Sequence, residues 1–454
     1  MYIEQIYTGC LAQASYYLES DGEAIIIDPI RDTDIYIQLL NKRSAKLKYV
    51  FETHFHADFV SGHIELTRLT DAQIVFGPNA NTLYDIISAK DQQEFNFGNL
   101  KIKVLHTPGH TLESVCYLLF SSDNLEKAVF TGDTLFIGEV GRPDLAVSRD
   151  VSAADLAGYL YDSLHNVLMQ LPASVIVYPG HGAGSACGKN IGTERTSTIG
   201  EQKQFNYALQ KMSKSEFVNL ILDGISEAPD YFLHDVLMNK EGYESISDIL
   251  QKSLQKLNPQ QIKSWINQNA VLLDVRMPND FENGFIPGSI NIGKTGMFAP
   301  WVGSIVAPKS NIVIICYPDE ENEIISRLAR IGYHQVVGYV HGIMEWKLEN
   351  HELDFVESIH PTKEIFNNKK DQIILDVRKD PELELGFVKD SVHIPLSQIT
   401  NQYHDIIKSK EYWIYCAGGY RSMIACSILK SKGYNNIKNI YGGFSAIARN
   451  MEDA

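Results

Sequence analysis

Short apolar runs that end in glycine- or proline-marked loops recur along the first half of this chain. Their length predicts buried strands, and the polar stretches between them predict turns and helices. The runs are AIIIDPI at 24–30, YVFE at 49–52, KIKVLH at 101–106, KAVF at 127–130 and SVIVY at 174–178. A lysine-rich stretch over 34–48 predicts a helix between the first two strands. The pattern indicates an α/β domain.

The second half contains an internal repeat of about one hundred residues. VLLDVRMPNDFENGFIPGSINI (271–292) recurs as IILDVRKDPELELGFVKDSVHIPL (373–396). The apolar runs NIVIIC and EYWIYC end at Cys316 and Cys416, which are 100 residues apart. Strands alternating with helices in each copy predict two α/β domains with parallel sheets and helices on both faces.

The length of 454 residues is sufficient for about three domains. A stretch over 227–259 predicts helical connecting sequence, and Pro361 marks a second boundary, between the repeats. We therefore expect a multidomain α/β chain with domains at 1–250, 256–355 and 359–454.

Charge and cysteine content narrow the class of protein. Forty Lys and Arg against fifty-six Asp and Glu give a net charge of −16, which argues against nucleic-acid and anionic membrane partners. No run of eighteen apolar residues predicts a spanning helix, and the N-terminus lacks the pattern of a signal peptide. Six cysteines do not make a disulfide framework, so we expect a protein of the reducing cytoplasm.

Histidine and aspartate side chains occupy four separate loops that follow predicted strands. The loops are THFHADFVSGH with His54, His56 and Asp58, TPGHT with His110, TGDTLF with Asp133, and YPGHG with His181. Loops at strand ends gather ligands from distant parts of an α/β chain. Imidazole and carboxylate together suit zinc, iron or manganese, so the first domain is predicted to bind a transition metal.

This series resembles the metallo-β-lactamase fold, an αββα sandwich whose signature runs His-x-His-x-Asp-His and then His, Asp and His. The resemblance covers about the first 240 residues. The chain departs from the signature at Phe59, where two-metal hydrolases of this fold have a second histidine. A phenyl ring cannot bind a metal, and the second site would keep only Asp58, His181 and a share of Asp133. We therefore expect a mononuclear centre.

Similarity to the persulfide dioxygenase branch of the fold implies one Fe(II) per chain. The ligands implied by this resemblance are His54, His110 and Asp133, and three positions stay open for substrate sulfur and dioxygen. His56, Asp58 and His181 then become residues that orient those ligands, with His56 as an orienter or a weak ligand. Zinc remains an alternative, since it outcompetes Fe(II) at most nitrogen and oxygen sites.

Two further segments resemble persulfide dioxygenases. GEVGRPDL (138–145) is similar to their Gly-Arg-x-Asp turn, in which Arg142 either binds substrate or locks the loop together with Asp144. HGAGSACGKNIGTERTSTIGEQKQFN is similar to the substrate-side segment of bacterial persulfide dioxygenases fused to sulfurtransferases. Its Cys187, six residues past His181, is either an inert packing residue or a thiol that relays sulfane sulfur beside the iron.

Both repeats of the second half resemble rhodanese domains, and the second carries the active form of the loop, CAGGYRS. Its strand delivers Cys416 into a loop in which Gly418 and Gly419 let backbone N–H groups point inward. These amides, the following helix N-terminus and Arg421 favour an anion, so a thiolate or a persulfide on this cysteine is stabilised.

The first repeat lacks that chemistry. After Cys316 the chain reads YPDEENE, with no glycine, no arginine and four carboxylates. Negative charge raises the pKa of a thiol and repels anionic persulfide or sulfite. We expect a degenerate unit that packs the other domains together, and a residual sulfur-carrying role for this cysteine is the alternative.

The order of the three parts resembles the bacterial persulfide dioxygenase–rhodanese fusion of sulfide-detoxifying operons. The resemblance implies an enzyme that oxidises low-molecular-weight thiol persulfides with O2 to sulfite. Sulfur carried on Cys416 then yields thiosulfate, so the chain is also a thiosulfate sulfurtransferase. It also implies a homo-oligomer. The alternatives are a glyoxalase II-like zinc thioester hydrolase with sulfurtransferase domains, and a sulfur-sensing protein whose rhodanese units dock partners.

Overall fold

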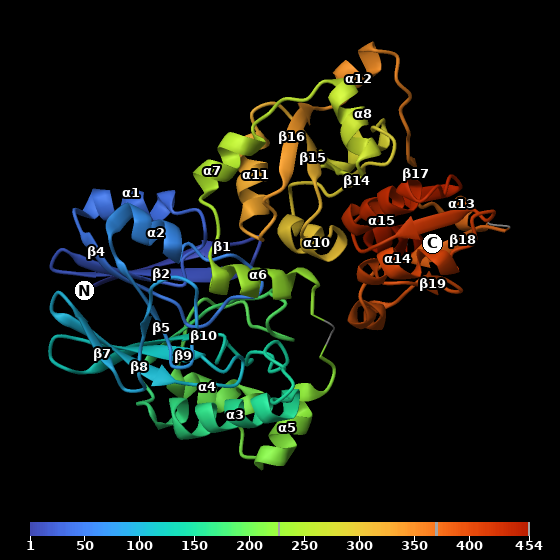
Figure 1. The fold of residues 1–454 in the computed structure, drawn as a ribbon. Coiled ribbons are helices and arrows are strands. Elements are labelled where there is room, and N and C mark those ends of the chain that lie inside the picture. Colours follow the sequence, from blue (N-terminus) through green and yellow to red (C-terminus); the bar gives the residue numbers. More distant parts are fainter. Residues whose placement is uncertain (226–227, 368–370, 453–454) are drawn as a thin grey trace. The chain divides into compact units, whose positions relative to one another are not determined.

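The computed structural model describes residues 1–225, 228–367 and 371–452, which form two compact units (Figure 1). The N-terminal unit comprises 1–247 together with 328–332, and the C-terminal unit comprises 248–327 and the residues from 333 onward. Residue 227, the first of the predicted helical connector, and residues 453–454 of the third predicted domain lie outside the described residues.

The N-terminal unit is a sandwich of two sheets with helices on the outer faces (Figure 1). In hydrogen-bonded order the first sheet is β1 (Tyr2–Thr8), β2 (Gln13–Ser20), β3 (Glu23–Ile27), β4 (Lys46–Phe51), β5 (Gln73–Phe76) and β6 (Ile87–Ser88). The second is β12 (Ser197–Thr198), β11 (Ile176–Pro179), β10 (Glu126–Gly132), β9 (Val115–Phe120), β8 (Leu100–His106) and β7 (Glu94–Phe97). The α-helices are α1 (Asp34–Arg43), α2 (His63–Thr70), α3 (Ala153–Asn166), α4 (Ile199–Phe205), α5 (Lys214–Leu222) and α6 (Tyr231–Glu241). The predicted αββα layering is confirmed.

Strand β9 shows why the amino-acid sequences of the central strands are unbroken apolar runs. Val115, Tyr117 and Leu119 belong to the core between the two sheets, whereas the alternate residues of the strand belong to the core beneath the helices. Tyr117 packs edge-on against Phe51 of the opposite sheet, with ring centroids 4.8 Å apart. A strand covered on both faces has no solvent side to mark with polar residues.

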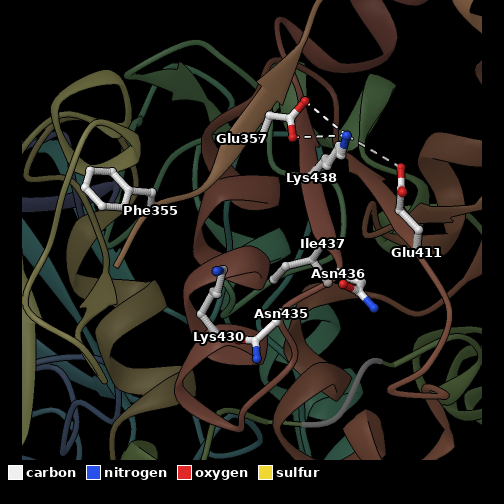
Figure 2. Close-up of a pocket in the computed structure, with 8 residues that line it drawn as sticks. All are labelled: Phe355, Glu357, Glu411, Lys430, Asn435, Asn436, Ile437 and Lys438. Carbon is white, nitrogen blue, oxygen red and sulfur yellow. Dashed lines mark hydrogen bonds and ion pairs between the residues drawn. The ribbon is translucent and has the colours of Figure 1, made fainter. Parts of the chain in front are cut away.

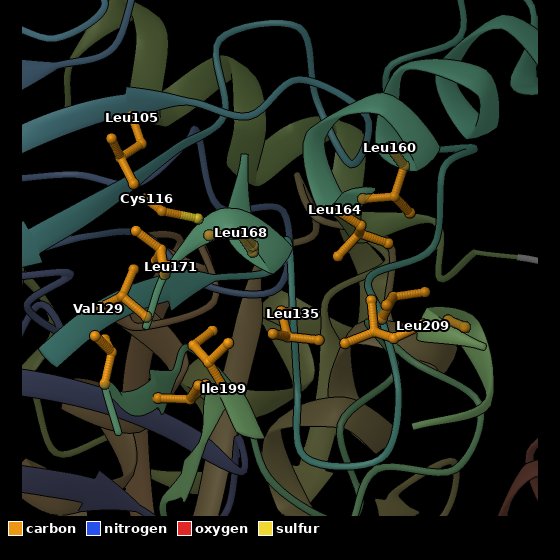
Figure 3. Packing of buried hydrophobic residues seen from close by; sticks show 14 of the residues in the cluster. Leu105, Cys116, Val129, Leu135, Leu160, Leu164, Leu168, Leu171, Ile199 and Leu209 are labelled. Atoms are coloured by element: carbon orange, nitrogen blue, oxygen red, sulfur yellow. The ribbon is translucent and has the colours of Figure 1, made fainter. Parts of the chain in front are cut away.

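Helix α3 begins at a capping box and turns a leucine stripe toward the second sheet (Figure 3). The Ser152 hydroxyl accepts from the Asp155 amide at 3.1 Å, and the Asp155 carboxylate accepts from the Ser152 amide at 2.9 Å. Leu160 and Leu164, one helical turn apart, pack with Leu135 in the same buried cluster. Full burial of each such side chain contributes about 1.5–3 kcal/mol.

The predicted helix over 34–48 is too long at its C-terminal end. Helix α1 ends at Arg43, and Ser44 adopts a left-handed φ of 53° that terminates it. Strand β4 begins at Lys46, and the Lys48 ammonium pairs with Glu23 of the neighbouring strand at 2.9 Å. The lysines suggested an exposed helix face, but Lys46 and Lys48 belong to strand β4. There a side chain can pair with a residue of the neighbouring strand, as Lys48 does.

The C-terminal unit contains two parallel sheets in which four strands follow the same order, and the second sheet has one further strand. The first repeat orders β14 (Ile290–Asn291), β13 (Val271–Asp274), β15 (Ile312–Cys316) and β16 (Val336–His341). The second orders β19 (Val392–His393), β18 (Ile373–Asp376), β20 (Tyr412–Tyr415), β21 (Ile437–Ile440) and β17 (Glu357–Ile359). The α-helices are α7 (Ile246–Ser253), α8 (Pro259–Asn267), α9 (Pro278–Glu282), α10 (Phe298–Ile305), α11 (Glu321–Ala329), α12 (Met344–Leu348), α13 (Lys363–Asn367), α14 (Leu396–Gln402), α15 (Tyr420–Ser431) and α16 (Gly443–Glu452). The predicted pair of parallel α/β domains is confirmed.

A buried aspartate–arginine pair fixes the same turn in both repeats. Arg276 Nη2 donates to Asp274 Oδ2 and Arg378 Nη2 donates to Asp376 Oδ2, each at 2.6 Å. Each guanidinium also donates to the carbonyl of the glycine eight residues further along, at 3.0 and 2.9 Å. The recurring Asp-Val-Arg sequence therefore has a structural role that is independent of the cysteine chemistry.

Among the described residues, the helices are too short or too polar to cross a bilayer.

Candidate functional site

The N-terminal unit brings the predicted metal ligands together at the ends of three strands. His54 follows β4, His110 follows β8 and Asp133 directly follows β10. One donor atom from each lies within 4.8 Å of the other two, and all three side chains are buried. These strands belong to two different sheets, so the packing of the two sheets against each other brings the three ligands together.

Asp133 provides the clearest sign that this cluster can hold a cation. Its Oδ2 is buried and has no hydrogen-bond partner among the described residues. That oxygen lies 3.5 Å from His110 Nε2 and 3.9 Å from His54 Nε2. Burial by itself raises the pKa of the Asp133 carboxyl, but His181, His54 and His110 hold this pKa well below its usual range. A buried carboxylate oxygen facing two imidazoles fits a transition metal held by two nitrogens and one oxygen.

Hydrogen bonds on the far side of each imidazole leave Nε2 free to bind a metal. His110 Nδ1 donates to the Arg142 carbonyl at 2.8 Å. The Thr53 hydroxyl donates to Asp28 at 2.8 Å, so it accepts from His54 Nδ1 at 3.0 Å. Burial, followed by the charge of His56, lowers the pKa of His54 and keeps its imidazole neutral. Neutral imidazoles anchored through Nδ1 are the form that binds metal ions.

His181 lies between two carboxylates. Its Nδ1 donates to Asp133 Oδ1 at 2.7 Å and its Nε2 donates to Asp58 Oδ2 at 2.9 Å. Burial alone lowers the pKa of His181, but Asp133 and Asp58 raise this pKa well above its ordinary value. His181 therefore links Asp133, a candidate metal ligand, to Asp58.

Cys187 is buried in the same place. Its sulfur, an Asp58 oxygen and a His181 nitrogen lie within 4.8 Å of one another. Burial and the charges of Asp58 and Asp133 raise the pKa of its thiol. The sequence offered Cys187 either as an inert packing residue or as a thiol beside the iron, and the structure groups it with Asp58 and His181.

His56 faces away from the His54–His110–Asp133 cluster. Its Nε2 lies 3.2 Å from Asp28 Oδ1 and 3.3 Å from Glu52 Oε2. Burial by itself lowers the pKa of His56, but the two carboxylates raise this pKa to about 10. Phe59 packs against the same ring in a tilted arrangement, with centroids 4.3 Å apart. His56 and Phe59 thus fill the space behind the ligands.

Asp28 and Glu52 were not predicted as site residues, although the sequence carried a signal for both. Asp28 directly follows β3, as Asp133 follows β10, and Glu52 directly follows β4. Asp28 accepts from the Thr53 amide at 2.7 Å and from its hydroxyl, which positions the residue before His54. Its left-handed φ of 49° is an uncommon conformation for aspartate, of a kind that gathers at functional sites.

Arg142 locks two loops in place. Its guanidinium donates to Asp144 at 2.6 and 2.7 Å and to the Ala186 carbonyl at 3.3 Å, and its amide donates to the Cys187 carbonyl at 3.0 Å. Its own carbonyl accepts from His110. The structure thus gives the side chain a loop-bracing position, while its predicted contact with substrate stays a prediction.

Gly141 permits the close approach of this loop to the metal ligands. A Cβ at this position would lie 1.9 Å from the Asp133 carbonyl oxygen and 3.1 Å from His110 Nδ1. We expect Gly141→Ala to lower the free energy of unfolding by roughly 1–3 kcal/mol, because the added methyl group overpacks this site. Tm should fall by about 2–10 °C. Bound metal per chain should fall with it, measured by elemental analysis. Gly9→Ala, whose Cβ meets nothing within 4 Å, is the control, and equal metal content in both variants would contradict the prediction.

In the C-terminal unit, Cys416 directly follows β20 and lies in the loop that leads to the N-terminus of α15. Its sulfur accepts from the Gly419 amide at 3.1 Å, and Gly419 has a positive φ of 102° that turns the amide inward. The thiol also lies 3.6 Å from the Ser422 hydroxyl, and Gly418 lies between the cysteine and the donating amide. The loop has the inward amide and the helix N-terminus that stabilise a sulfur anion.

Arg421 makes a contact that the sequence did not reveal. Its two terminal nitrogens donate to both oxygens of Glu382 at 2.5 and 2.6 Å. Glu382 lies in the 3-10 helix η3 (Asp380–Leu385), directly after the Asp376–Arg378 turn. Its pKa is lowered mainly by the hydrogen bond from Arg421. Arg421, whose positive charge was predicted to bind an anionic substrate, is therefore paired with the Glu382 carboxylate.

Figure 2 shows a polar pocket that residues of the second repeat line. Glu411, which lines it, precedes β20, whereas Cys416 follows that strand. Lys438 spans the pocket and pairs with Glu357 at 3.0 Å and with Glu411 at 3.7 Å. The cysteine loop and this pocket are therefore separate features.

Comparison with known proteins gives the family of each part. The metallo-beta-lactamase superfamily model matches residues 8–84 and 75–181, and the rhodanese-like domain model matches 258–349 and 360–450. A probable hydroxyacylglutathione hydrolase of Schizosaccharomyces pombe is 30% identical over 219 residues, which are 42% of this chain and 80% of that protein. The probable polyketide biosynthesis zinc-dependent hydrolase PksB of Bacillus subtilis is 32% identical over 173 residues, 37% of this chain and 71% of that protein.

A solved structure extends the similarity beyond the N-terminal unit. The crystal structure of a metallo-beta-lactamase from Staphylococcus aureus matches with a TM-score of 0.65 and 29% identity. The match covers 75% of this chain and 98% of that one. The chain belongs to the metallo-beta-lactamase superfamily, and two rhodanese-like domains follow its metal-binding unit.

Proposed function

We propose that this chain oxidises low-molecular-weight thiol persulfides with O2 to sulfite at one Fe(II), and forms thiosulfate with sulfur carried on Cys416. One observation carries the proposal: the unpartnered Asp133 Oδ2 faces the Nε2 atoms of His54 and His110. Two nitrogens and one carboxylate on one face are typical of non-haem Fe(II) oxygenases. When bound, the ion would supply Lewis acidity and redox chemistry toward O2.

The surrounding residues support one ion rather than two. Phe59 occupies the position at which two-metal hydrolases of this fold have a further histidine, and its phenyl ring cannot bind a metal. The ring packs in a tilted arrangement against His56. The chain's own contribution is to hold His54 and His110 in one tautomer and to keep the site dry.

Cys416 would carry the sulfur in two steps. The thiolate attacks the outer sulfur of a thiol persulfide, so a Cys–S–S bond forms and the thiol leaves. Sulfite then attacks the terminal sulfur, which breaks that bond, releases thiosulfate and regenerates the thiolate. The Gly419 amide, 3.1 Å from the sulfur, stabilises the anion in both states.

The test combines elemental analysis of the purified protein with an oxygen electrode. Iron together with O2 uptake on addition of glutathione persulfide supports the proposal. Zinc with hydrolysis of a glutathione thioester, and no O2 uptake, overturns it.

A second candidate is a thioester hydrolase with two metal ions. The grouping of Asp58, His181 and Cys187 beside Asp133 offers a second set of ligands, and the relatives include probable hydroxyacylglutathione hydrolases. Two metal ions per chain would favour this function.

Glu382 sets how strongly the cysteine loop attracts anions. We expect Glu382→Gln to lower the KM for thiosulfate about three- to tenfold, because Arg421 is released from its bidentate charged partner. The measurement is sulfur transfer from thiosulfate to cyanide. Glu384→Gln, an exposed carboxylate of the same 3-10 helix, is the control. A higher KM would mean that Glu382 positions Arg421 for substrate.

A further inference from the structure

The first repeat of the C-terminal unit gathers three potential metal ligands at the carboxyl edge of its sheet. Cys316 ends β15 and His341 ends β16, and the strand register places these two residues side by side. Glu321 is the first residue of α11, which follows β15. The carboxyl ends of neighbouring parallel strands are where α/β domains collect ligands.

The three side chains are close enough to share one ion. The sulfur, the carboxylate oxygen and the imidazole nitrogen all lie within 4.8 Å of one another, and His341 Nε2 is 3.3 Å from Glu321 Oε2. Cys316 is fully buried, while the side chains of Glu321 and His341 are 13% and 26% exposed, which leaves an entry path. The Cys316 thiol donates a hydrogen bond to the Val340 carbonyl, with 4.0 Å between the sulfur and the oxygen.

The second repeat provides an internal comparison. Arg421 occupies the position of Glu321, 100 residues further along, and Tyr441 occupies the position of His341. The cysteine is common to both repeats, but its neighbours change from a cation and a phenol to a carboxylate and an imidazole. The arginine of the second repeat favours a sulfur anion, whereas the cysteine, carboxylate and imidazole of the first repeat are a set of zinc ligands.

We propose that Cys316, Glu321 and His341 bind one Zn2+ ion, with a fourth position left for water. On binding, the sulfur–zinc bond forms and the thiol proton passes to solvent. The thiolate and the carboxylate then balance the two charges of the ion. The site ties the start of α11 to the sheet edge and commits Cys316 to the metal, so this cysteine does not carry sulfur.

Local charge supports this assignment. The carboxylates of Glu321 and Glu320 lie near the Cys316 thiol. Glu320 pairs with Lys294 at 2.9 Å through Oε1, while its buried Oε2 has no partner among the described residues. A zinc ion relieves this excess of negative charge, and because it displaces a proton its affinity rises with pH.

The test is titration of the full-length protein with Co2+ alone, read as the near-ultraviolet sulfur-to-cobalt absorption band. We expect Cys316→Ser to remove the band that this cysteine contributes and to lower tightly bound zinc by one ion per chain. His341→Gln, at a partly exposed position, should weaken binding by at least about tenfold while the circular dichroism spectrum stays unchanged.

Cys416→Ser is the matched control, because it changes the corresponding cysteine of the second repeat and should leave the titration unaltered. Cys187→Ser in parallel accounts for any band from the N-terminal unit. If His341→Gln and the unsubstituted protein show the same band and the same affinity, the proposal is wrong. An equal zinc content in Cys316→Ser and the unsubstituted protein also overturns it.

Discussion

Asp133→Asn is expected to lose its bound metal and, with it, persulfide-dependent O2 uptake. Asp133 Oδ2 faces both candidate histidine ligands and Oδ1 accepts from His181, so one side chain serves two roles. An amide has no negative charge and must turn its NH2 group toward either the metal position or His181. Loss of an outer partner of a metal ligand costs 10- to 100-fold in affinity or activity, so loss of a direct ligand should cost more than about 100-fold.

The measurement is iron and zinc per chain together with the rate of O2 consumption. Asp162→Asn is the control, because this exposed carboxylate pairs only at the surface, with Lys214 at 2.6 Å. Retention of both metal and O2 uptake by Asp133→Asn would remove this residue from the metal site.

Cys416→Ser is expected to separate the two halves of the reaction. O2 uptake with a thiol persulfide should stay near that of the unsubstituted protein, because the oxidation depends on the N-terminal unit. Thiosulfate should fall at least about 100-fold and sulfite should replace it, since serine cannot carry a sulfane sulfur covalently. Chromatographic separation of the two products measures the change.

Cys10→Ser is the control for loss of a cysteine elsewhere in the chain. It lies in the N-terminal unit and is only partly buried. An unchanged thiosulfate yield in Cys416→Ser would exclude the second repeat from the reaction and would leave the oxidation step untouched.

The sequence predicted the ligand cluster because each donor follows a strand of recognisable pattern. The runs before His110 and Asp133 are short and apolar, and β8 and β10 lie where those runs predicted strands. Asp28 was overlooked although it follows the run AIII in the same way, because the signature that the chain resembles does not include it.

The sequence did not predict which side chains that are far apart in the chain contact one another. Arg421 was expected to serve an anion, and the structure pairs it with Glu382, 39 residues earlier. Cys187 was one candidate for a thiol beside the iron, but its proximity to Asp58, which is 129 residues earlier, depends on two loops meeting. Phe59 suggested a single ion, and the sequence could not show that His181 lies between two carboxylates.

The sequence by itself determined the layered α/β architecture, the two related repeats and the identity of the side chains available for metal and sulfur chemistry. These are local properties, because apolar periodicity and glycine positions act within a few residues. Only the tertiary structure decided which of those side chains meet. The reason is physical: hydrogen bonds and ion pairs act over a few ångströms, and only folding sets which distant residues come that close.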